Sequence, residues 1–434
     1  MICYGLRVAR YGSLKKGTIE FQLTTRNSQR VTRNRQLEVQ KMTISKKIED
    51  IISRASFIRK MFEEGAQLKA KYGPENVYDF SLGNPNLPPP EKFNELLRDT
   101  VDSCGLGDHC YMPNTGYPMV CGSVADYLAE EQHAPVTEKE ILMTCGASGA
   151  LNVALKTILD PGDQVITPAP CFVEYKFYAD NHGGTLKTVP TQPDFQLDLE
   201  GLSEAITKKT KAVLINSPNN PTGQVYPEKD LLALGELLTR KSQEHRRTIY
   251  LISDEPYRKI VYDDVQVPSI FTSYKNSIIG TSYSKDISIP GERIGFAAIN
   301  PAADYKSDLI AGMAVSNRIL GFVNAPALMQ RVVACMQGMS VQISEYKRKR
   351  DLLCEGLTAC GYEFIKPAGT FYLFPRSPIP DDVEFVNALK KERVLVVPGS
   401  GFDGPGYFRI AFCVDDDVIR NSMPGFQKAI EKYN

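Results

Sequence analysis

The sequence predicts an α/β fold in which helices flank a mostly parallel sheet of seven strands. Short apolar runs, typical of buried strands, alternate with longer segments of helical periodicity over the middle of the chain. We expect the strands at residues 141–144, 164–167, 186–189, 211–216, 249–253, 277–282 and 294–299. Because parallel neighbours need crossover connections, ligand-binding groups should gather in the loops that follow the carboxyl ends of these strands.

The helices expected around this sheet follow from apolar residues that recur every three or four positions. They cover residues 92–103, 118–132, 149–159, 172–181, 198–207 and 228–243, and the pattern becomes helical again from Asp304. A long helical stretch from about 323 to 358 should link this large domain to the rest of the chain.

Both ends of the chain predict a smaller α+β domain. Apolar residues recur with a helical period over residues 48–71, and an extended, proline-rich segment follows. Further strands are expected at 371–375, 394–397 and 407–412, with helices at 383–392 and at the C-terminus. We therefore divide the chain into an N-terminal helix and arm (42–90), a large domain (91–320), and a linker helix with a small C-terminal domain (321–434).

Residues 1–41 are basic, poor in acidic residues and without a helical apolar face. Only Glu20 and Glu38 stand against nine lysines and arginines in this segment. A transit peptide, a disordered basic arm and an upstream extension all fit this composition. We expect a basic extension outside the fold, with the folded region starting near Met42.

Bulk composition argues against several classes of function. The 434 residues are 42% apolar and 24% charged, with 51 basic and 51 acidic side chains. This balance does not require a nucleic acid or a membrane surface as a partner. The 10 cysteines and four histidines are scattered without zinc-ligand spacing, so we expect no metal site and a cytoplasmic location. Organellar import through residues 1–41 stays open.

The loop after the sixth strand contains the most informative residues. Lys285 follows three hydroxyl-bearing residues, and Arg293 stands eight positions later, near two glycines. A lysine that is partly deprotonated can form an imine with an aldehyde, and an arginine with hydroxyl groups can bind a phosphate. The pair suggests a phosphorylated aldehyde such as pyridoxal phosphate, although a surface lysine is the commoner explanation for Lys285 alone.

Three other strand-end loops carry complementary groups. Small residues and Ser148 follow the first strand, where a helix N-terminus can bind an anion. Asn220, whose side chain can donate to a ligand, follows the fourth strand. Asp254 and Tyr257 follow the fifth, and a carboxylate there can pair with a protonated pyridine nitrogen. Each loop also fits an ordinary turn, but the coincidence of four favours a cofactor site.

With these motifs, the chain resembles the class I/II aminotransferases of the pyridoxal-phosphate fold type I superfamily. The motifs are Ser81-Leu82-Gly83-Asn84-Pro85, Asn216-Ser217-Pro218-Asn219-Asn220-Pro221-Thr222-Gly223, Ser253-Asp254-Glu255-Pro256-Tyr257, Ser282-Tyr283-Ser284-Lys285, Gly291-Glu292-Arg293-Ile294-Gly295 and Phe408-Arg409-Ile410. The resemblance implies that pyridoxal 5'-phosphate is the cofactor and that residues 91–320 bind it. It also implies transfer of an amino group from an L-amino acid to a 2-oxo acid by a ping-pong mechanism through a lysine aldimine.

The resemblance assigns roles to single residues. It implies that Lys285 forms the aldimine and moves the proton, that Asp254 pairs with the pyridine nitrogen, and that Tyr257 and Asn220 bind the ring hydroxyl. The remaining cofactor contacts that it implies are Ala147, Ser148, Ser282 and Arg293 at the phosphate and Phe172 stacked on the ring. Arg409, Gly83 and Asn220 would bind the substrate. Tyr111 would reach a phosphate across a dimer interface, which implies a homodimer with shared active sites.

The resemblance leaves the reaction and the substrate open. The same scaffold hosts carbon–sulfur β-lyases and cyclopropane-forming synthases, and a non-catalytic regulator that senses a ligand is a distant alternative. Enzymes specific for dicarboxylates need a second cation for the side-chain carboxylate. Lys176 and Arg318 are candidates, but solvated surface also explains both. Aspartate, alanine or an aromatic amino acid could be the donor.

Overall fold

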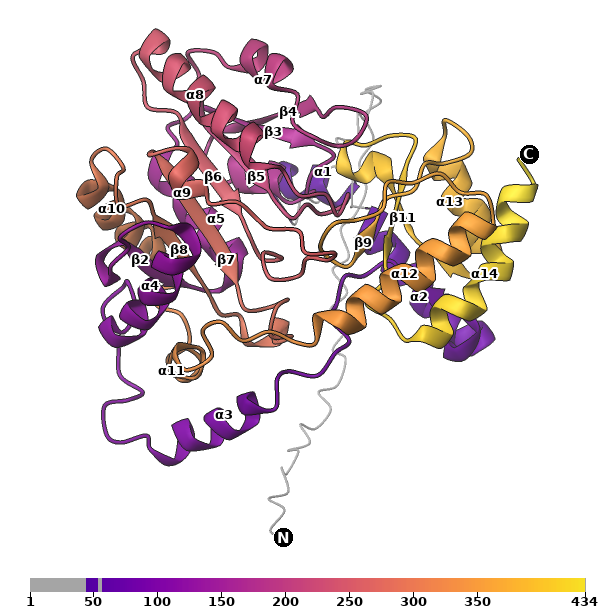
Figure 1. Ribbon diagram of the computed structural model, residues 1–434, viewed down its shortest axis with the longest axis horizontal. Helices are drawn as coiled ribbons and strands as arrows, with labels where there is room; N and C mark the ends of the chain where they lie inside the picture. Colours follow the sequence, from indigo (N-terminus) through magenta and orange to yellow (C-terminus); the bar gives the residue numbers. More distant parts are fainter. Residues whose placement is uncertain (1–43, 54–56, 434) are drawn as a thin grey trace, which may run out of the picture. The chain divides into compact units, whose positions relative to one another are not determined.

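The computed structural model describes residues 44–53 and 57–433 of the chain (Figure 1). Contacts divide the chain into two units, residues 1–54 and 55–434. The described part of the first unit contains the helix α1 (Lys46–Ser53). The predicted basic extension, residues 1–41, lies outside the described residues. All elements named below belong to the second unit.

A seven-stranded sheet among the described residues confirms the predicted α/β fold (Figure 1). The strand order is β2-β8-β7-β6-β5-β3-β4, and β8 runs antiparallel to both of its neighbours while the remaining pairs are parallel. The strands are β2 (Ile141–Thr144), β3 (Gln164–Ala169), β4 (Thr185–Pro190), β5 (Thr210–Asn216), β6 (Tyr250–Asp254), β7 (Ser277–Ser282) and β8 (Gly295–Ile299). The parallel register aligns the carboxyl ends of β5 and β6, where Asn216 lies opposite Asp254.

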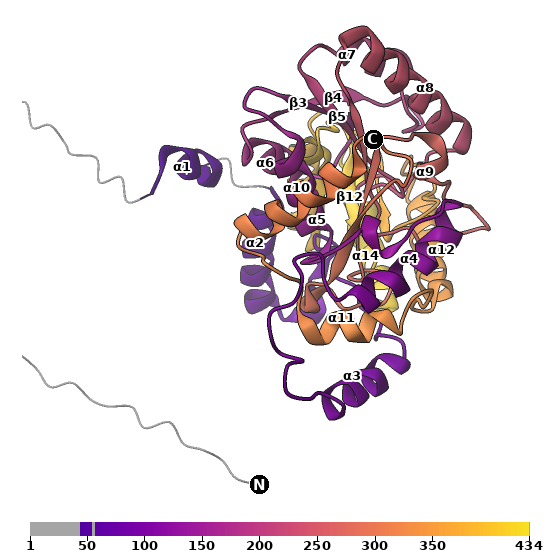
Figure 2. The same cartoon turned by 90° about the vertical axis from the view of Figure 1, so that its left-hand side faces the viewer.

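Helices cover both faces of the sheet because successive strand residues point to opposite sides. In β5, Val213 and Ile215 enter one apolar core, and Ala212 and Leu214 enter the other. The first core also includes residues of α3 (Lys92–Asp102), α4 (Pro118–Gln132), α7 (Leu199–Ala205), α8 (Glu228–His245), α9 (Ile270–Ser273) and α11 (Ala327–Ala334). The second includes residues of α5 (Gly146–Ile158), α6 (Tyr175–Asp180) and α10 (Lys306–Ile319). Figure 2 shows α3 beside α11.

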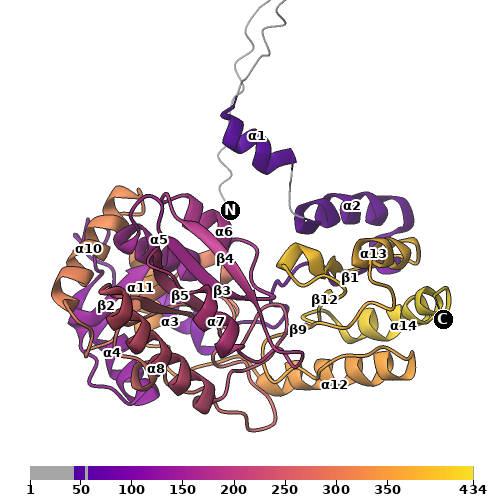
Figure 3. The same cartoon turned by 90° about the horizontal axis from the view of Figure 1, so that it is seen from above.

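A separate apolar core joins segments from both ends of the chain, as expected for the smaller α+β domain. It includes Phe80, Phe371, Phe408 and Phe426. The elements of this region are α2 (Phe57–Tyr72), β1 (Tyr78–Asp79), α12 (Ile343–Ala359), β9 (Tyr372–Leu373), α13 (Asp382–Lys391), β10 (Val394–Leu395), β11 (Val397–Pro398), β12 (Phe408–Ala411) and α14 (Asp416–Glu431). β1 pairs with β10, and β12 pairs with β11 and β9. Figure 3 shows α12, α13 and α14 around these short strands. The domain boundaries stay predictions.

The long helix predicted for residues 323–358 is wrong, because this stretch contains the two helices α11 and α12. α11 ends at Ala334, and Gly338, in the turn that follows, has a φ of 79°, a left-handed conformation through which a right-handed helix cannot continue. The backbone N–H of Val341 then donates to the carbonyl of Asp286 at 2.7 Å. The intervening segment is therefore held against the loop that follows β7.

Two helix boundaries also differ from the prediction. The helix predicted from Gly149 begins at Gly146, so Ala147 and Ser148 lie in the first turn of α5. The helix predicted for residues 172–181 is only α6, which leaves Phe172 in the preceding loop. No helix within residues 44–53 and 57–433 combines the length and the apolar composition that a membrane span requires.

Candidate active site

A cavity of about 320 Å³ lies at the carboxyl ends of β5, β6 and β7. The residues of the sequence prediction that line it are Gly83, Ala147, Ser148, Phe172, Asn220, Asp254, Tyr257, Ser282, Lys285, Arg293 and Arg409. Tyr111 does not line the cavity and is 91% exposed. Lys176 and Arg318 are also exposed and lie outside this lining. One cavity thus combines groups from the ends of five strands, β2, β3, β5, β6 and β7, and from both ends of the chain.

Lys285 extends into this cavity from the loop after β7. Its Nζ donates a hydrogen bond to the carbonyl of Gly83 at 2.9 Å and lies 5.5 Å from the centre of the Phe371 ring. Burial lowers the pKa of Lys285 to about 8, and the positive charges of Arg409 and Arg293 act in the same direction. The amine therefore loses its proton more readily than a surface lysine, which makes it a better nucleophile and base.

Asp254, the last residue of β6, has a carboxylate that is only half satisfied. Its Oδ2 accepts a hydrogen bond from the Tyr175 hydroxyl at 2.5 Å. Its Oδ1 is buried and has no hydrogen-bond partner among the described residues. Burial raises the pKa of Asp254 to about 7, although the bond from Tyr175 opposes this shift. A buried acceptor without a donor is costly, so a cationic N–H in the cavity would be bound strongly here.

Tyr175 was not predicted as a site residue. It begins α6 and is almost fully buried, and its ring packs edge-on against Phe172 at 5.5 Å. Three positions separate Tyr175 from Phe172, so the same turn of chain supplies both the predicted stacking ring and the donor to Asp254. A buried tyrosine is common in apolar cores, so the sequence alone gave no chemical signal for this role.

Arg409 is held on β12 between two aromatic rings. Its guanidinium carbon lies 4.5 Å from the centre of the Tyr372 ring and 4.7 Å from that of Phe402. Nη1 donates to Asn220 Oδ1 at 3.0 Å and Nη2 to the carbonyl of Ser81 at 2.8 Å, while Nε is buried without a partner in the described part of the chain. The guanidinium is thus fixed in advance for a planar anion such as a carboxylate.

Tyr372 lies beside Arg409 and also contacts Gly83 and Tyr257. It was not predicted as a site residue. Its hydroxyl lies 3.1 Å from that of Tyr257, and burial raises the pKa of both tyrosines. Both hydroxyls therefore stay protonated and can donate to a ligand. A Cβ atom on residue 83 would overlap the Tyr372 hydroxyl, so this approach of backbone to ring requires glycine.

The opposite end of the cavity has the character of an anion site. Gly146, with a φ of 76°, turns the chain from β2 into α5, and the first turn of that helix supplies Ala147 and Ser148. Arg293 donates to the carbonyl of Cys145 at 3.4 Å and would lie 3.0 Å from a Cβ atom on Gly146. Free N–H groups at a helix start, hydroxyls and a guanidinium together suit a phosphate.

The chemistry of the donor set fits pyridoxal phosphate. An anion site, a reactive amine and a buried acceptor line one cavity, and a second fixed guanidinium is available for a substrate carboxylate. Each feature corresponds to one group of a phosphorylated pyridine aldehyde or of an amino acid.

Comparisons with known proteins agree with this chemistry. The sequence profile of the family described as aminotransferase class I and II matches residues 75–423. The chain is 32% identical to a probable aspartate aminotransferase of Methanocaldococcus jannaschii over 354 residues, which are 80% of this chain and 91% of the relative. It is 34% identical to a probable aspartate/prephenate aminotransferase of Thermus aquaticus over 358 residues, covering 81% and 91%.

A solved structure shares both fold and sequence with the chain. The crystal structure of an amino transferase from Eubacterium rectale superposes with a TM-score of 0.88 at 40% identity, covering 91% of this chain and all of that one. The family profile and the two relatives each span most of the chain. This chain therefore belongs to the class I and II aminotransferases, which are pyridoxal-phosphate-dependent enzymes of fold type I.

Proposed function

We propose that the chain transfers an amino group from an L-amino acid to a 2-oxo acid by a ping-pong mechanism. The reaction would take place in the cavity at the carboxyl ends of β5, β6 and β7. The observation that carries this proposal is that Asp254 Oδ1, which has no hydrogen-bond partner within residues 44–53 and 57–433, belongs to the same cavity lining as the Lys285 amine. A buried carboxylate oxygen without a donor matches a protonated ring nitrogen. An amine of lowered pKa matches an aldehyde.

In this proposal, the cavity binds pyridoxal phosphate in one orientation. Asp254 would hold the ring nitrogen in its protonated form, and the Lys285 amine would lie at the aldehyde. The other contacts are Tyr257 and Asn220 to the ring hydroxyl, Phe172 against the ring, and Ala147, Ser148, Ser282 and Arg293 to the phosphate. The bound cofactor supplies an electron sink that is conjugated with the substrate α-carbon.

Lys285 acts as the base. With an amino acid bound in the cavity, the Lys285 Nζ would accept the proton of the substrate α-carbon. The low polarity that lowers the pKa of this amine to about 8 leaves a useful fraction of it unprotonated near neutral pH.

Arg409 orients the substrate for this proton transfer. A carboxylate bound to its guanidinium would fix one end of the amino acid while the α-carbon faces Lys285. The two rings on either side of Arg409 and its bond to Asn220 limit its movement. Gly83 offers its backbone to the same carboxylate.

We further propose a homodimer in which Tyr111 reaches the phosphate of a second subunit. Tyr111 lies outside the cavity of its own chain, and its neighbourhood in sequence carries the exposed side chains Val101, Leu106 and Met119. Exposed apolar side chains of this size favour a protein contact. Equilibrium sedimentation tests the dimer, and a loss of phosphate affinity in Tyr111→Phe would support the shared site.

We also propose a cytoplasmic role in amino-acid biosynthesis. The nine described cysteines are all free thiols, which suits a reducing compartment. Cell fractionation of the full chain and of a variant without residues 1–41 tests the location, because an imported protein would change compartment on truncation.

The amino donor is best found by a panel. The relatives named above are described as aspartate and aspartate/prephenate aminotransferases, so aspartate is the first donor to assay against 2-oxoglutarate, and prephenate, which is itself a 2-oxo acid, is a second acceptor to assay with it. The described residues of the cavity contain three cationic side chains, Lys285, Arg293 and Arg409, and each already has a proposed partner.

The decisive experiment supplies an amino acid without an acceptor. A transaminase should release one equivalent of 2-oxo acid per active site and stop until a second 2-oxo acid is added. Continuous release of pyruvate and ammonia would instead identify a β-lyase, and no release with any donor would point to a regulator that only binds.

A further inference from the structure

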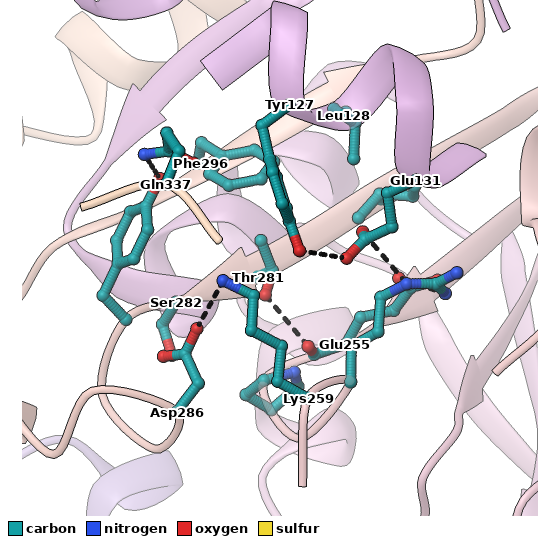
Figure 4. A pocket seen from close by; sticks show the side chains of 14 residues that line it. Tyr127, Leu128, Glu131, Glu255, Lys259, Thr281, Ser282, Asp286, Phe296 and Gln337 are labelled. Carbon is teal, nitrogen blue, oxygen red and sulfur yellow. Dashed lines mark hydrogen bonds and ion pairs between the residues drawn. The ribbon is translucent and has the colours of Figure 1, made fainter. Parts of the chain in front are cut away.

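We call the cavity of about 320 Å³, in which we propose that the cofactor binds, the cofactor cavity. A second, much smaller cavity of about 30 Å³ lies next to it. The two share Pro256 and Ser282 in their linings. Figure 4 shows that charged side chains from α4 and from the loops after β6 and β7 converge here. We call this group the buried charge cluster, and it consists of Tyr127, Glu131, Glu255, Arg258, Lys259 and Asp286.

One half of the buried charge cluster centres on Arg258. Its Nη1 pairs with Glu255 at 3.1 Å and its Nε pairs with Glu131 at 3.0 Å, and the Arg258 side chain is only 10% exposed. Glu255 also accepts a hydrogen bond from Ser253 at 2.7 Å. Glu131 accepts one from the Tyr127 hydroxyl at 3.0 Å. Each of these charges therefore has an opposite charge or a donor in contact.

The other half centres on Lys259. Its Nζ lies 3.4 Å from Asp286 Oδ2, 4.7 Å from the centre of the Tyr127 ring and 3.3 Å from the carbonyl of Met339. Asp286 Oδ1 accepts a hydrogen bond from the backbone N–H of Ile287 at 2.9 Å. Burial raises the pKa of Asp286, and the charge of Lys259 opposes that shift. Figure 4 shows Lys259 and Asp286 pointing toward one another.

Two members of the buried charge cluster are neighbours in sequence of the residues proposed to bind the cofactor. Glu255 directly follows Asp254, and Asp286 directly follows Lys285. A continuous set of contacts thus runs from the neighbour of the ring-binding carboxylate, through Arg258 and α4, to the neighbour of the reactive lysine.

We propose that Lys259 is a positioning residue that fixes the loop carrying Lys285 relative to the strand end carrying Asp254. This role rests on the functions proposed for Lys285 and Asp254. A buried ion pair is a weak source of stability because both groups lose their hydration, and an apolar pair of similar size often stabilises as well. It does impose one geometry, and a displacement of about 1 Å at a reacting group can cost roughly a hundredfold in rate.

The test compares Lys259→Met with Lys275→Met. Lys275 pairs with Asp304 at 2.7 Å just before β7, so it lies at the other end of the same strand, and it lines neither cavity. Lys259→Met should lower kcat about tenfold or more, with KM changed less than about threefold. It should also slow imine formation between the cofactor-free protein and added pyridoxal phosphate, followed by visible absorbance. Lys275→Met should leave both rates unchanged.

Two further variants keep the test decisive if Lys259→Met folds poorly. Asp286→Asn is nearly isosteric and should reproduce the slow imine formation, whereas Lys259→Arg keeps the charge and should restore most of the rate. The double variant Lys259→Met/Asp286→Asn should be no slower than either single variant, since all three lose the same contact.

The outcomes separate this inference from the proposed function. If Lys259→Met and Asp286→Asn lower only the melting temperature and keep the wild-type kcat and imine rate, the cluster is structural and the inference is wrong. If Lys285→Ala still forms the imine, the proposed role of Lys285 fails instead, whatever the Lys259 variants do.

Discussion

The cofactor cavity and the buried charge cluster contain the same kinds of side chain but satisfy them differently. In the cluster, Glu255 has partners for both carboxylate oxygens, and Lys259 faces the carboxylate of Asp286. In the cavity, one oxygen of the adjacent Asp254 has no partner among the described residues, and Lys285 contacts a carbonyl rather than a carboxylate. Unmet hydrogen-bonding capacity, rather than charge, therefore distinguishes the cavity, which we propose binds a ligand, from the buried charge cluster, which we propose supports it.

The largest effect should come from the cavity lysine. Lys285→Ala removes the amine that bonds to the aldehyde, so turnover should fall by at least about 10³-fold and the visible absorbance of the lysine imine should disappear. Both can be followed on the purified protein after addition of pyridoxal phosphate. An unchanged spectrum in Lys285→Ala would contradict the role proposed for Lys285.

Neutralising Asp254 should lower activity without lowering stability, whereas neutralising the adjacent Glu255 should lower stability. Asp254→Asn should lower kcat by roughly 10²–10³-fold because the ring nitrogen loses its charged partner. It should not lower the free energy of unfolding of the cofactor-free protein, since an unpartnered buried charge is removed. Glu255→Gln should lower that free energy by about 3 kcal/mol because Arg258 loses a buried partner. Urea unfolding measures the free energy of unfolding of both variants. Equal destabilisation by the two substitutions would contradict the proposed difference between the cavity and the cluster.

The pH dependence of stability should reveal Asp254 directly. Burial raises its pKa from 3.8 to about 7, so the folded protein keeps a proton that the unfolded chain has already released between these values. The contribution of Asp254 to the stability of the cofactor-free protein should therefore fall as the pH rises through this window, by up to about 1.4 kcal/mol per pH unit. Asp254→Asn should remove this contribution, so the difference in stability between the two proteins should change with pH, and a constant difference would contradict the raised pKa of Asp254.

A smaller effect is expected from Tyr175→Phe. This change removes the donor to Asp254 Oδ2, and a hydrogen bond to a charged group contributes about 1.5–3 kcal/mol. The affinity for pyridoxal phosphate should fall about tenfold, because the ionised form of Asp254 is less stable. Tyr226→Phe is the matched control, since Tyr226 is equally buried but does not line the cavity. Equal losses in both variants would show a general packing effect.

The smallest effect should come from the exposed cations. Lys176→Met should change kcat/KM for aspartate less than about twofold, because the side chain is solvated and outside the cavity. Alanine as a second donor provides the control. A loss confined to aspartate would instead identify Lys176 as the side-chain cation.

Much of the cavity could be predicted because its groups follow strands. Asp254 ends one recognisable buried strand and Lys285 follows the next, and the parallel arrangement brings those strand ends together. Their residue types also match definite chemical tasks. The positions could therefore be found from local sequence, while the roles assigned to them stay proposals.

The contacts that the sequence did not reveal depend on distant residues that meet in space. Tyr372 acquires its place from the approach of Gly83, and Lys259 from Asp286, and neither partner is implied by local periodicity. The break between α11 and α12 was missed for a related reason. The segment between the helices includes Gly338 with a positive φ, and Val341 donates to the carbonyl of the distant Asp286.

The location of Arg409 on β12 has a consequence for how the protein is made. β12 pairs with β9 and β11 and is followed by the C-terminal helix α14 alone. During synthesis, Asp254 and Lys285 leave the ribosome long before Arg409, and domains generally fold in order of emergence. A nascent chain thus contains the residues that we propose bind the cofactor well before it contains Arg409, which we propose binds the substrate carboxylate.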